Sequence, residues 1–230
     1  MFDTHTVPVV TIDGPSGSGK GTICQLLAKE LGWHLLDSGA LYRIVGLAAE
    51  RKGLGFDDAA ALADLAANLN VEFRPSEPGE PSAVLLDHED ISNEVRSESS
   101  GTLASKVAIH QPVREALKSL QRSFAKAPGL VADGRDMGTI VFPAAAVKIY
   151  LIASAEERAQ RRYQQLISKG ESVNLAALLE DIQQRDQRDM NRSIAPLKPA
   201  DDAIVIDSSG TAIADVFSQV LSQVQARIQS

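Results

Sequence analysis

The chain has 230 residues and a formal net charge of −7, from 23 Lys and Arg against 30 Asp and Glu. Its 44% hydrophobic and 23% charged residues are ordinary for one globular body with room for an inserted subdomain. The acidic balance argues against nucleic-acid binding, and no apolar run approaches the roughly 18 residues of a membrane helix. The lone Cys24 excludes an intrachain disulfide and Cys-rich zinc sites, so a reducing cytoplasm is the expected location.

Short apolar runs alternate with helical segments along most of the chain. The runs at 7–12, 33–36, 129–133, 147–153 and 203–207 are short and mostly unalternated, as in strands buried on both faces of a parallel sheet. The alternation predicts an α/β layered fold. Helices are expected at 19–31, 38–52, 57–68, 93–109, 113–127, 155–169, 175–190 and 211–228.

The segment from Val71 to Asp87 departs from this alternation of strands and helices. Residues Val71–Arg74 alternate like a half-buried strand, residues 75–81 form a turn cluster rich in proline, and 83–87 resemble a second strand. We expect a small antiparallel hairpin here, inserted into the βα pattern. The predicted insert covers 68–105, within a core of 1–67 and 106–230.

A glycine-rich segment follows the first expected strand and opens a helix. Its residues are Gly14, Pro15, Ser16, Gly17, Ser18, Gly19, Lys20, Gly21 and Thr22. They match G-x4-G-K, the Walker A core, in which backbone N–H groups and a helix N-terminus surround phosphate oxygens and the lysine reaches them. Gly21 stands where the general motif has Ser or Thr, so Thr22 supplies the hydroxyl, directly to Mg²⁺ or through water. The alternative is a purely structural linker.

A kinase for a small acceptor needs a second anion site, whereas a GTPase switch needs an N-K-x-D segment, which this chain lacks. Ser38, at the start of a helix, and Arg43, one turn further, form a candidate phosphate site. Ser38 as a plain helix cap and Arg43 as a surface cation are the alternative.

Two further clusters carry charge. Asp133, Arg135 and Asp136 follow a strand whose carboxyl end faces the ligand crevice of a parallel sheet, where Asp133 suits Mg²⁺ binding through water. Turn formation alone is the competing explanation. Residues 185–192 hold three arginines on one helical stripe, with Asp189 beside them, and a solvated helix with i,i+4 ion pairs is the alternative there.

Four segments, GPSGSGKGT, WHLLDSGALYR, VADGRDMGT and RDQRDMNR, occur in the order and spacing of the bacterial cytidylate kinases, and the chain resembles that family from about Val9 to Asp207. The resemblance implies a P-loop kinase fold with a central five-stranded parallel sheet flanked by helices, and a lid at about 158–192. It also implies transfer of the γ-phosphoryl group of ATP to CMP or dCMP with Mg²⁺. The chain is expected to act as a monomer on small nucleotides, with no membrane or nucleic-acid partner.

The resemblance further implies a role for each matching residue. Gly14 to Thr22 hold the ATP phosphates, and Thr22, Asp37 and Asp133 organise the metal. Ser38, Arg43, Arg135 and Arg192 surround the acceptor phosphate and the transferring group. Ser105, Arg114 and Asp136 read cytosine, and Arg185 and Asp189 hold the ribose. Arg161 and Arg162 are the expected lid arginines, and Lys20, Arg135, Arg162 and Arg192 are the expected catalytic residues.

Other functions remain open on the residues alone. One is a kinase for another acceptor, such as a different monophosphate, shikimate or dephospho-coenzyme A. Another is a regulator that senses ATP without transferring phosphate, and a third is a P-loop protein that binds nucleic acid.

Overall fold

The computed structural model describes residues 7–74, 83–168 and 170–228. The chain divides into two compact units, one made of Met1–Asp37 and Arg122–Ser230 and the other of Ser38–Gln121. The predicted insert at 68–105 lies inside the second unit, and its role as a separate subdomain stays a prediction. Within the described part of the chain, no helix is long and apolar enough to cross a membrane.

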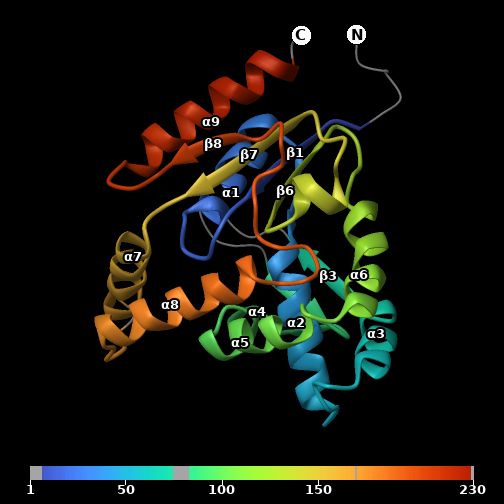
Figure 1. The fold of residues 1–230 in the computed structure, drawn as a ribbon. Helices are drawn as coiled ribbons and strands as arrows, with labels where there is room; N and C mark the ends of the chain where they lie inside the picture. The colour runs from blue at the N-terminus through green and yellow to red at the C-terminus, as the bar shows by residue number, and fades with distance from the viewer. Residues whose placement is uncertain (1–6, 75–82, 169, 229–230) are drawn as a thin grey trace. The chain divides into compact units, whose positions relative to one another are not determined.

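The first unit is built on a five-stranded parallel sheet in the order β2-β6-β1-β7-β8, which confirms the predicted fold class (Figure 1). Its strands are β1 (Val9–Asp13), β2 (His34–Asp37), β6 (Leu130–Gly134), β7 (Val147–Ile152) and β8 (Ile204–Asp207). The central strands β1 and β6 are buried at every position, which explains their unalternated apolar sequence.

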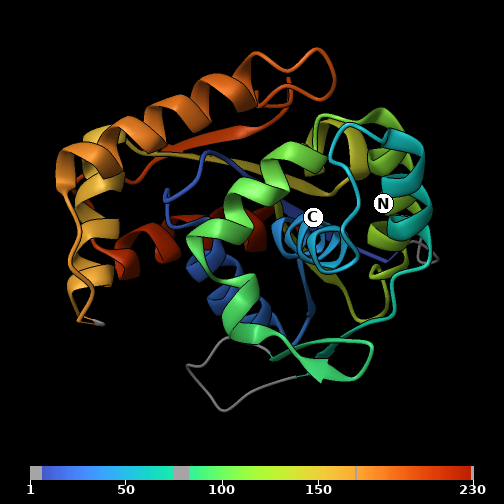
Figure 2. The ribbon, with the colours of Figure 1, turned by 90° about the horizontal axis from the view of Figure 1, so that it is seen from below.

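Helices α1 (Lys20–Leu31) and α9 (Ile213–Ile228) pack together against one face of this sheet. Their apolar stripes, including Ile23, Leu27 and Val220, form one core with the side chains of β1, β6 and β7. Cys24 lies in the same core and is fully buried. Helices α7 (Ala155–Ser168) and α8 (Leu175–Met190) lie side by side in both views (Figures 1 and 2).

The second unit contains most of the remaining helices and a small antiparallel sheet. Its helices are α2 (Ser38–Arg51), α3 (Ala59–Ala67), α4 (Ser92–Val95), α5 (Glu98–Val107) and α6 (Gln111–Ser123), whose last two residues belong to the first unit. Strands β3 (Val71–Arg74) and β4 (Ala83–Leu86) pair antiparallel as predicted, and the expected turn at 75–81 lies outside the described residues. A third strand, β5 (Glu89–Asp90), was not predicted because two residues carry no periodicity.

Two predicted helices were wrong in detail. The single helix expected at 93–109 is divided into α4 and α5, because Ser97 has an extended backbone and its side chain accepts from the Ser100 amide as the cap of α5. Helix α6 starts at Gln111 and ends at Ser123, not at Ala127. Asp136 is followed by a π-helical turn that was not predicted, η1 (Met137–Val141), in which the Phe142 amide donates to the Met137 carbonyl.

Candidate functional site

The glycine-rich loop runs from the carboxyl end of β1 to the amino end of α1, as predicted. Gly14, Gly17 and Gly19 have φ values of +154°, +79° and +91°. A Cβ on Gly14 would lie 2.1 Å from the Leu151 carbonyl oxygen, so only glycine fits there. Gly19 caps α1 without a side-chain hydrogen bond, and the first turn of α1 has no acidic residue of its own to oppose the positive end of the helix dipole. This loop is built to bind an anion.

Lys20 is the cation of this loop. Its ammonium donates to the Pro15 carbonyl at 3.1 Å and lies 3.9 Å from Asp133 Oδ1. Burial, reinforced by the charge of Arg135, lowers the Lys20 pKa to about 8, and Asp133 opposes that shift. A polyphosphate placed in the loop supplies the negative charge that such a buried ammonium favours.

Two carboxylates lie at the carboxyl ends of neighbouring strands beside the loop. Asp37 on β2 and Asp133 on β6 are register partners in the parallel sheet. A Cβ on Gly21 would lie 3.3 Å from Asp133 Oδ2, so a serine or threonine at that position would crowd the carboxylate. This contact explains why the loop has Gly21 where the general motif has a hydroxyl. Thr22, next along α1, is exposed.

These oxygen donors fit a Mg²⁺ ion, which takes one or two carboxylates together with waters and substrate phosphates and needs no protein cage. In the part of the chain that the structure describes, no group of three or more His, Cys, Asp or Glu side chains is arranged to hold a metal ion.

An ionic cluster joins the turn after β6 to the end of α8. Asp189 is 1% exposed, and its Oδ2 accepts from Arg135 Nε at 3.0 Å while its Oδ1 pairs with Arg192. Burial acts to raise the Asp189 pKa, but the charges of Arg135 and Arg192 outweigh it, and the pKa lies below its usual value. Two arginines share one carboxylate, so these three side chains together carry one net positive charge.

The sequence did not reveal Asp13, the residue that fixes the turn after β6. Its carboxylate is buried and accepts from the amides of Met137 and Gly138, both at 2.8 Å. Asp13 therefore caps η1 from a different strand, since 124 positions in the sequence separate it from Met137. Asp136, the predicted cytosine reader, sits at the start of this turn and is 3% exposed. Burial raises the Asp13 pKa to about 7, although the two backbone donors act in the opposite direction.

The predicted lid arginines make contacts within the first unit. Arg161 Nη1 donates to Ser208 Oγ at 3.2 Å, and Ser208 Oγ in turn donates to the Ser18 carbonyl in the loop, at 3.0 Å. Arg162 Nη1 donates to Gln165 on the same helix. Arg185, on α8, is partly buried and is one of the charges that lower the pKa of Lys20.

The second unit holds the other predicted acceptor residues. Ser38 is the first residue of α2, and its buried hydroxyl donates to Gln121 Oε1 at 2.9 Å. Arg43 donates to the Val95 carbonyl at 2.8 Å, which ties α2 to α4.

Two further acceptor candidates lie on α5 and α6. Ser105 donates to the Gly101 carbonyl within α5. Arg114 is buried, with its guanidinium 5.4 Å from the centre of the Tyr42 ring. Tyr42 and Gln121 could not be selected from the sequence, because their contacts with Arg114 and Ser38 join residues distant in the chain.

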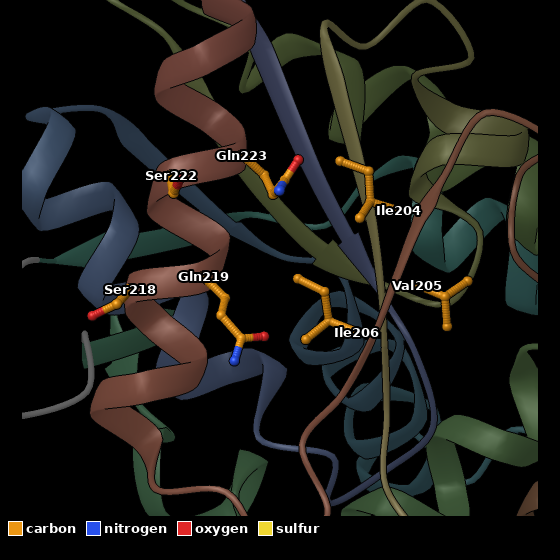
Figure 3. A pocket seen from close by; sticks show the side chains of 7 residues that line it. All are labelled: Ile204, Val205, Ile206, Ser218, Gln219, Ser222 and Gln223. Carbon is orange, nitrogen blue, oxygen red and sulfur yellow. The ribbon is translucent and has the colours of Figure 1, made fainter.

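A groove elsewhere on the first unit contains none of these residues. It has a volume of about 530 Å³ and lies between the edge strand β8 and α9 (Figure 3). Its lining has no charged side chain, so it is unsuited to phosphate. The residues that line it are Ile204, Val205, Ile206, Ser218, Gln219, Ser222 and Gln223.

These features define the class of protein as a P-loop phosphotransferase. They are a glycine-rich loop with a buried lysine, two carboxylates at the strand ends and a separate arginine cluster. Comparison with known proteins makes this class specific. The family model for cytidylate kinase matches residues 10–226. The chain belongs to the cytidylate kinase family, whose enzymes phosphorylate cytidylate.

Individual relatives agree over nearly the whole chain. The cytidylate kinase of Shewanella denitrificans is 58% identical over 225 residues, covering 98% of this chain and 99% of that protein. The cytidylate kinase of Aeromonas hydrophila is 57% identical over 221 residues, covering 96% and 95%. An uncharacterized protein from Eubacterium ventriosum has a similar fold, with a TM-score of 0.52 at 11% identity and coverage of 96% and 99%.

Proposed function

We propose that this protein transfers the γ-phosphoryl group of ATP to CMP or dCMP and releases ADP with CDP or dCDP. The observation that supports the proposal is that one unit holds a glycine-rich loop with the buried Lys20 and, separately, two arginines paired with the buried Asp189, which we take as the donor and acceptor phosphate sites. A phosphotransferase must hold a donor phosphate and an acceptor phosphate, whereas a sensor of ATP needs one anion site. Membership of the family supports CMP and dCMP as the acceptors.

On the donor side, the backbone amides of the loop and the amino end of α1 bind the triphosphate. Lys20 brings its ammonium to the β and γ oxygens. Asp37, Asp133 and Thr22 hold Mg²⁺, directly or through water. When bound, this ion neutralises charge on the phosphate oxygens.

On the acceptor side, Ser38 and Arg43 bind the CMP phosphate, and Arg185 and Asp189 bind the ribose. Asp189 also holds Arg135 and Arg192 beside one another through its two ion pairs. Those two arginines and Arg162 stabilise charge on the equatorial oxygens of the transferring group. The acceptor phosphate is itself the nucleophile, so the protein positions the reactants and needs no general base.

Base selection follows from hydrogen-bonding complementarity. The Asp136 carboxylate accepts from the cytosine N4 amino group, and Arg114 and Ser105 serve the N3 and O2 acceptors. Uracil has a carbonyl oxygen at position 4, which would face the carboxylate without a proton between them. A buried carboxylate opposite a carbonyl is costly, and UMP is therefore a poor substrate.

We propose further that the enzyme is a cytoplasmic monomer. Its substrates are small cytoplasmic nucleotides, and the net charge of −7 disfavours binding to nucleic acid or anionic lipid. A lid that includes α7 and α8, at about 158–192, closes over the nucleotides and excludes water, since water at the γ-phosphate would hydrolyse ATP.

The test is ADP production by the purified protein with ATP, Mg²⁺ and one acceptor at a time. The acceptors are CMP, dCMP, UMP, AMP, GMP, dTMP and shikimate. Turnover confined to CMP and dCMP is the expected result. Turnover with another acceptor would support a phosphotransferase but contradict the assignment of cytosine as the base. ATP binding without ADP formation for any acceptor would favour a sensor of ATP.

A further inference from the structure

Arg158 makes contacts with the phosphate-binding loop that neither the sequence nor the proposed function accounts for. It lies in the first turn of α7 and is 3% exposed. Its Nε donates to the Ala153 carbonyl at 3.0 Å, and its Nη1 donates to the Ser16 carbonyl at 3.0 Å. Its Nη1 and Nη2 also donate to the two carboxylate oxygens of Asp186 on α8. One buried guanidinium therefore joins α7, the loop and α8.

The contact with Ser16 determines the orientation of a peptide group in the loop. The Ser16–Gly17 peptide is trans, so its C=O and N–H point in opposite directions. Because Arg158 holds the Ser16 oxygen, the Gly17 N–H is directed away from α7. Gly17 is exposed and has a φ of +79°. Backbone amides that point into the concavity of such a loop are the donors that bind phosphate.

The packing behind the loop leaves this peptide little freedom. A Cβ on Gly17 would lie 3.2 Å from Arg158 Cβ, so α7 supports the loop at this point. Asp186 holds the guanidinium in a bidentate pair, which fixes the plane of the fork more strictly than a single hydrogen bond. A lysine at position 158 would keep the charge but not the planar fork.

We propose that Arg158 is a positioning residue: it orients the Ser16–Gly17 peptide so that the Gly17 amide faces the bound triphosphate, and Asp186 holds Arg158 in place. The proposal rests on the proposed function in that Gly14–Thr22 bind the phosphates of ATP. It predicts that Asp186 governs donor affinity through Arg158 and the loop peptide.

Three variants test this: Arg158→Lys, Asp186→Asn and, as a matched control, Asp181→Asn, which alters an exposed carboxylate on the same helix. Binding of ATP and of inorganic tripolyphosphate is measured by calorimetry well below each unfolding temperature, and KM for ATP and CMP by ADP production. Tripolyphosphate isolates the loop because it carries no base or ribose.

We expect Arg158→Lys and Asp186→Asn to lower the affinity for ATP and the affinity for tripolyphosphate by a similar factor. The expected factor is about tenfold, which corresponds to the loss of one charge-assisted hydrogen bond. The KM for CMP should change by less than about twofold, and Asp181→Asn should match the wild type. A role in stability alone would lower the unfolding temperature and leave both affinities unchanged.

Unchanged tripolyphosphate and ATP affinity in both variants would overturn the proposal, as would a loss confined to CMP. The binding measurements need no catalysis, so they decide the role of Arg158 even if ADP production fails with every acceptor. That failure would count against the proposed function alone.

Discussion

Asp189 and Arg135 form a buried ion pair between the end of α8 and the turn after β6, with Oδ2 accepting from Nε at 3.0 Å across 54 residues of sequence. Arg192 occupies the other oxygen of the same carboxylate. The pair fixes the direction of Arg135 and joins α8 to the turn at the carboxyl end of β6. Both arginines therefore depend on one carboxylate for their ion pairs.

Replacing Asp189 with asparagine should damage both stability and catalysis. The change leaves two partly buried guanidinium groups without their shared anion, and breaking a buried pair costs about 3–5 kcal/mol. We expect the free energy of unfolding in urea to fall by at least about 2 kcal/mol, because water reaches Arg135 and Arg192 in part. We also expect kcat/KM for CMP to fall about 100-fold, with a smaller effect on KM for ATP. Asp201→Asn, at an exposed position, is the control, and equal stability of the two variants would contradict the prediction.

The sheet and the loop could be predicted because their signals are local. A buried parallel strand needs a short apolar run, and an anion-binding loop needs glycines with a lysine at fixed spacing. Both patterns are complete within about ten residues. The division of 93–109 into α4 and α5 was missed because Ser97 also occurs within helices, and only its backbone conformation makes it a cap.

The contacts that hold the site together could not be predicted in this way. Asp13 precedes the first loop glycine and suggests a turn, but its two donors belong to η1. Arg158 belongs to an arginine-rich helix, and its sequence does not distinguish it from Arg161 or Arg162. Only the tertiary structure shows that Arg158 reaches Ser16 and Asp186. Such contacts depend on how whole helices and strands pack together, and this packing produces no periodic pattern in the sequence.

Binding of ATP should weaken as pH rises above 8. Burial lowers the Lys20 pKa to about 8 in the free protein, whereas bound phosphate favours the charged ammonium. Binding therefore takes up a proton above this pH, and the Kd should rise toward about tenfold per pH unit if only the charged form binds. Calorimetry from pH 7 to 9.5 measures this slope. Lys20→Arg stays charged over the whole range, so a slope that persists in that variant would refute the assignment.

Asp13 should make the protein less stable as pH rises toward neutrality. Its pKa is about 7 in the folded protein against an ordinary value of 3.8. Between these values the unfolded chain loses the proton that the folded protein keeps, so the stability that Asp13 contributes below pH 4 is lost as pH rises through 7. Urea unfolding at pH 4.5, 6 and 7.5 should show the wild type losing stability relative to Asp13→Asn. A constant difference between the two proteins across this range would exclude the effect.

Asp136 should determine the choice between CMP and UMP. With Asp136→Ala, no carboxylate remains to reject a carbonyl at position 4 of the base. Asp136→Asn goes further, because its amide can donate to that carbonyl. We expect the ratio of kcat/KM for CMP over UMP to fall at least about 100-fold in both variants, with Asp136→Asn the better UMP kinase of the two. Full discrimination in Asp136→Ala would show that another residue reads the base.

Gly46 on α2 sets how closely α5 packs against it. A Cβ at this position would lie 2.6 Å from Leu103 Cβ and 3.0 Å from the Leu103 carbonyl carbon, so part of the clash is with backbone that cannot rotate away. Alanine gains about 1 kcal/mol in helix propensity over glycine, but overpacking of this kind costs about 1–3 kcal/mol. Because the contact is so short, the clash should win, and we expect Gly46→Ala to destabilise the protein by about 1–2 kcal/mol.

The same substitution tests whether this packing serves substrate binding. Helix α2 carries Ser38 and Arg43, and α5 carries Ser105, so moving one helix from the other should raise KM for CMP and leave KM for ATP unchanged. Gly55→Ala is the control, since a Cβ there meets nothing within 4 Å and the glycine does not have a positive φ. Urea unfolding and steady-state kinetics of the two variants give the comparison. If Gly46→Ala is as stable as Gly55→Ala, the two helices adapt to the extra methyl group and their spacing does not limit acceptor binding.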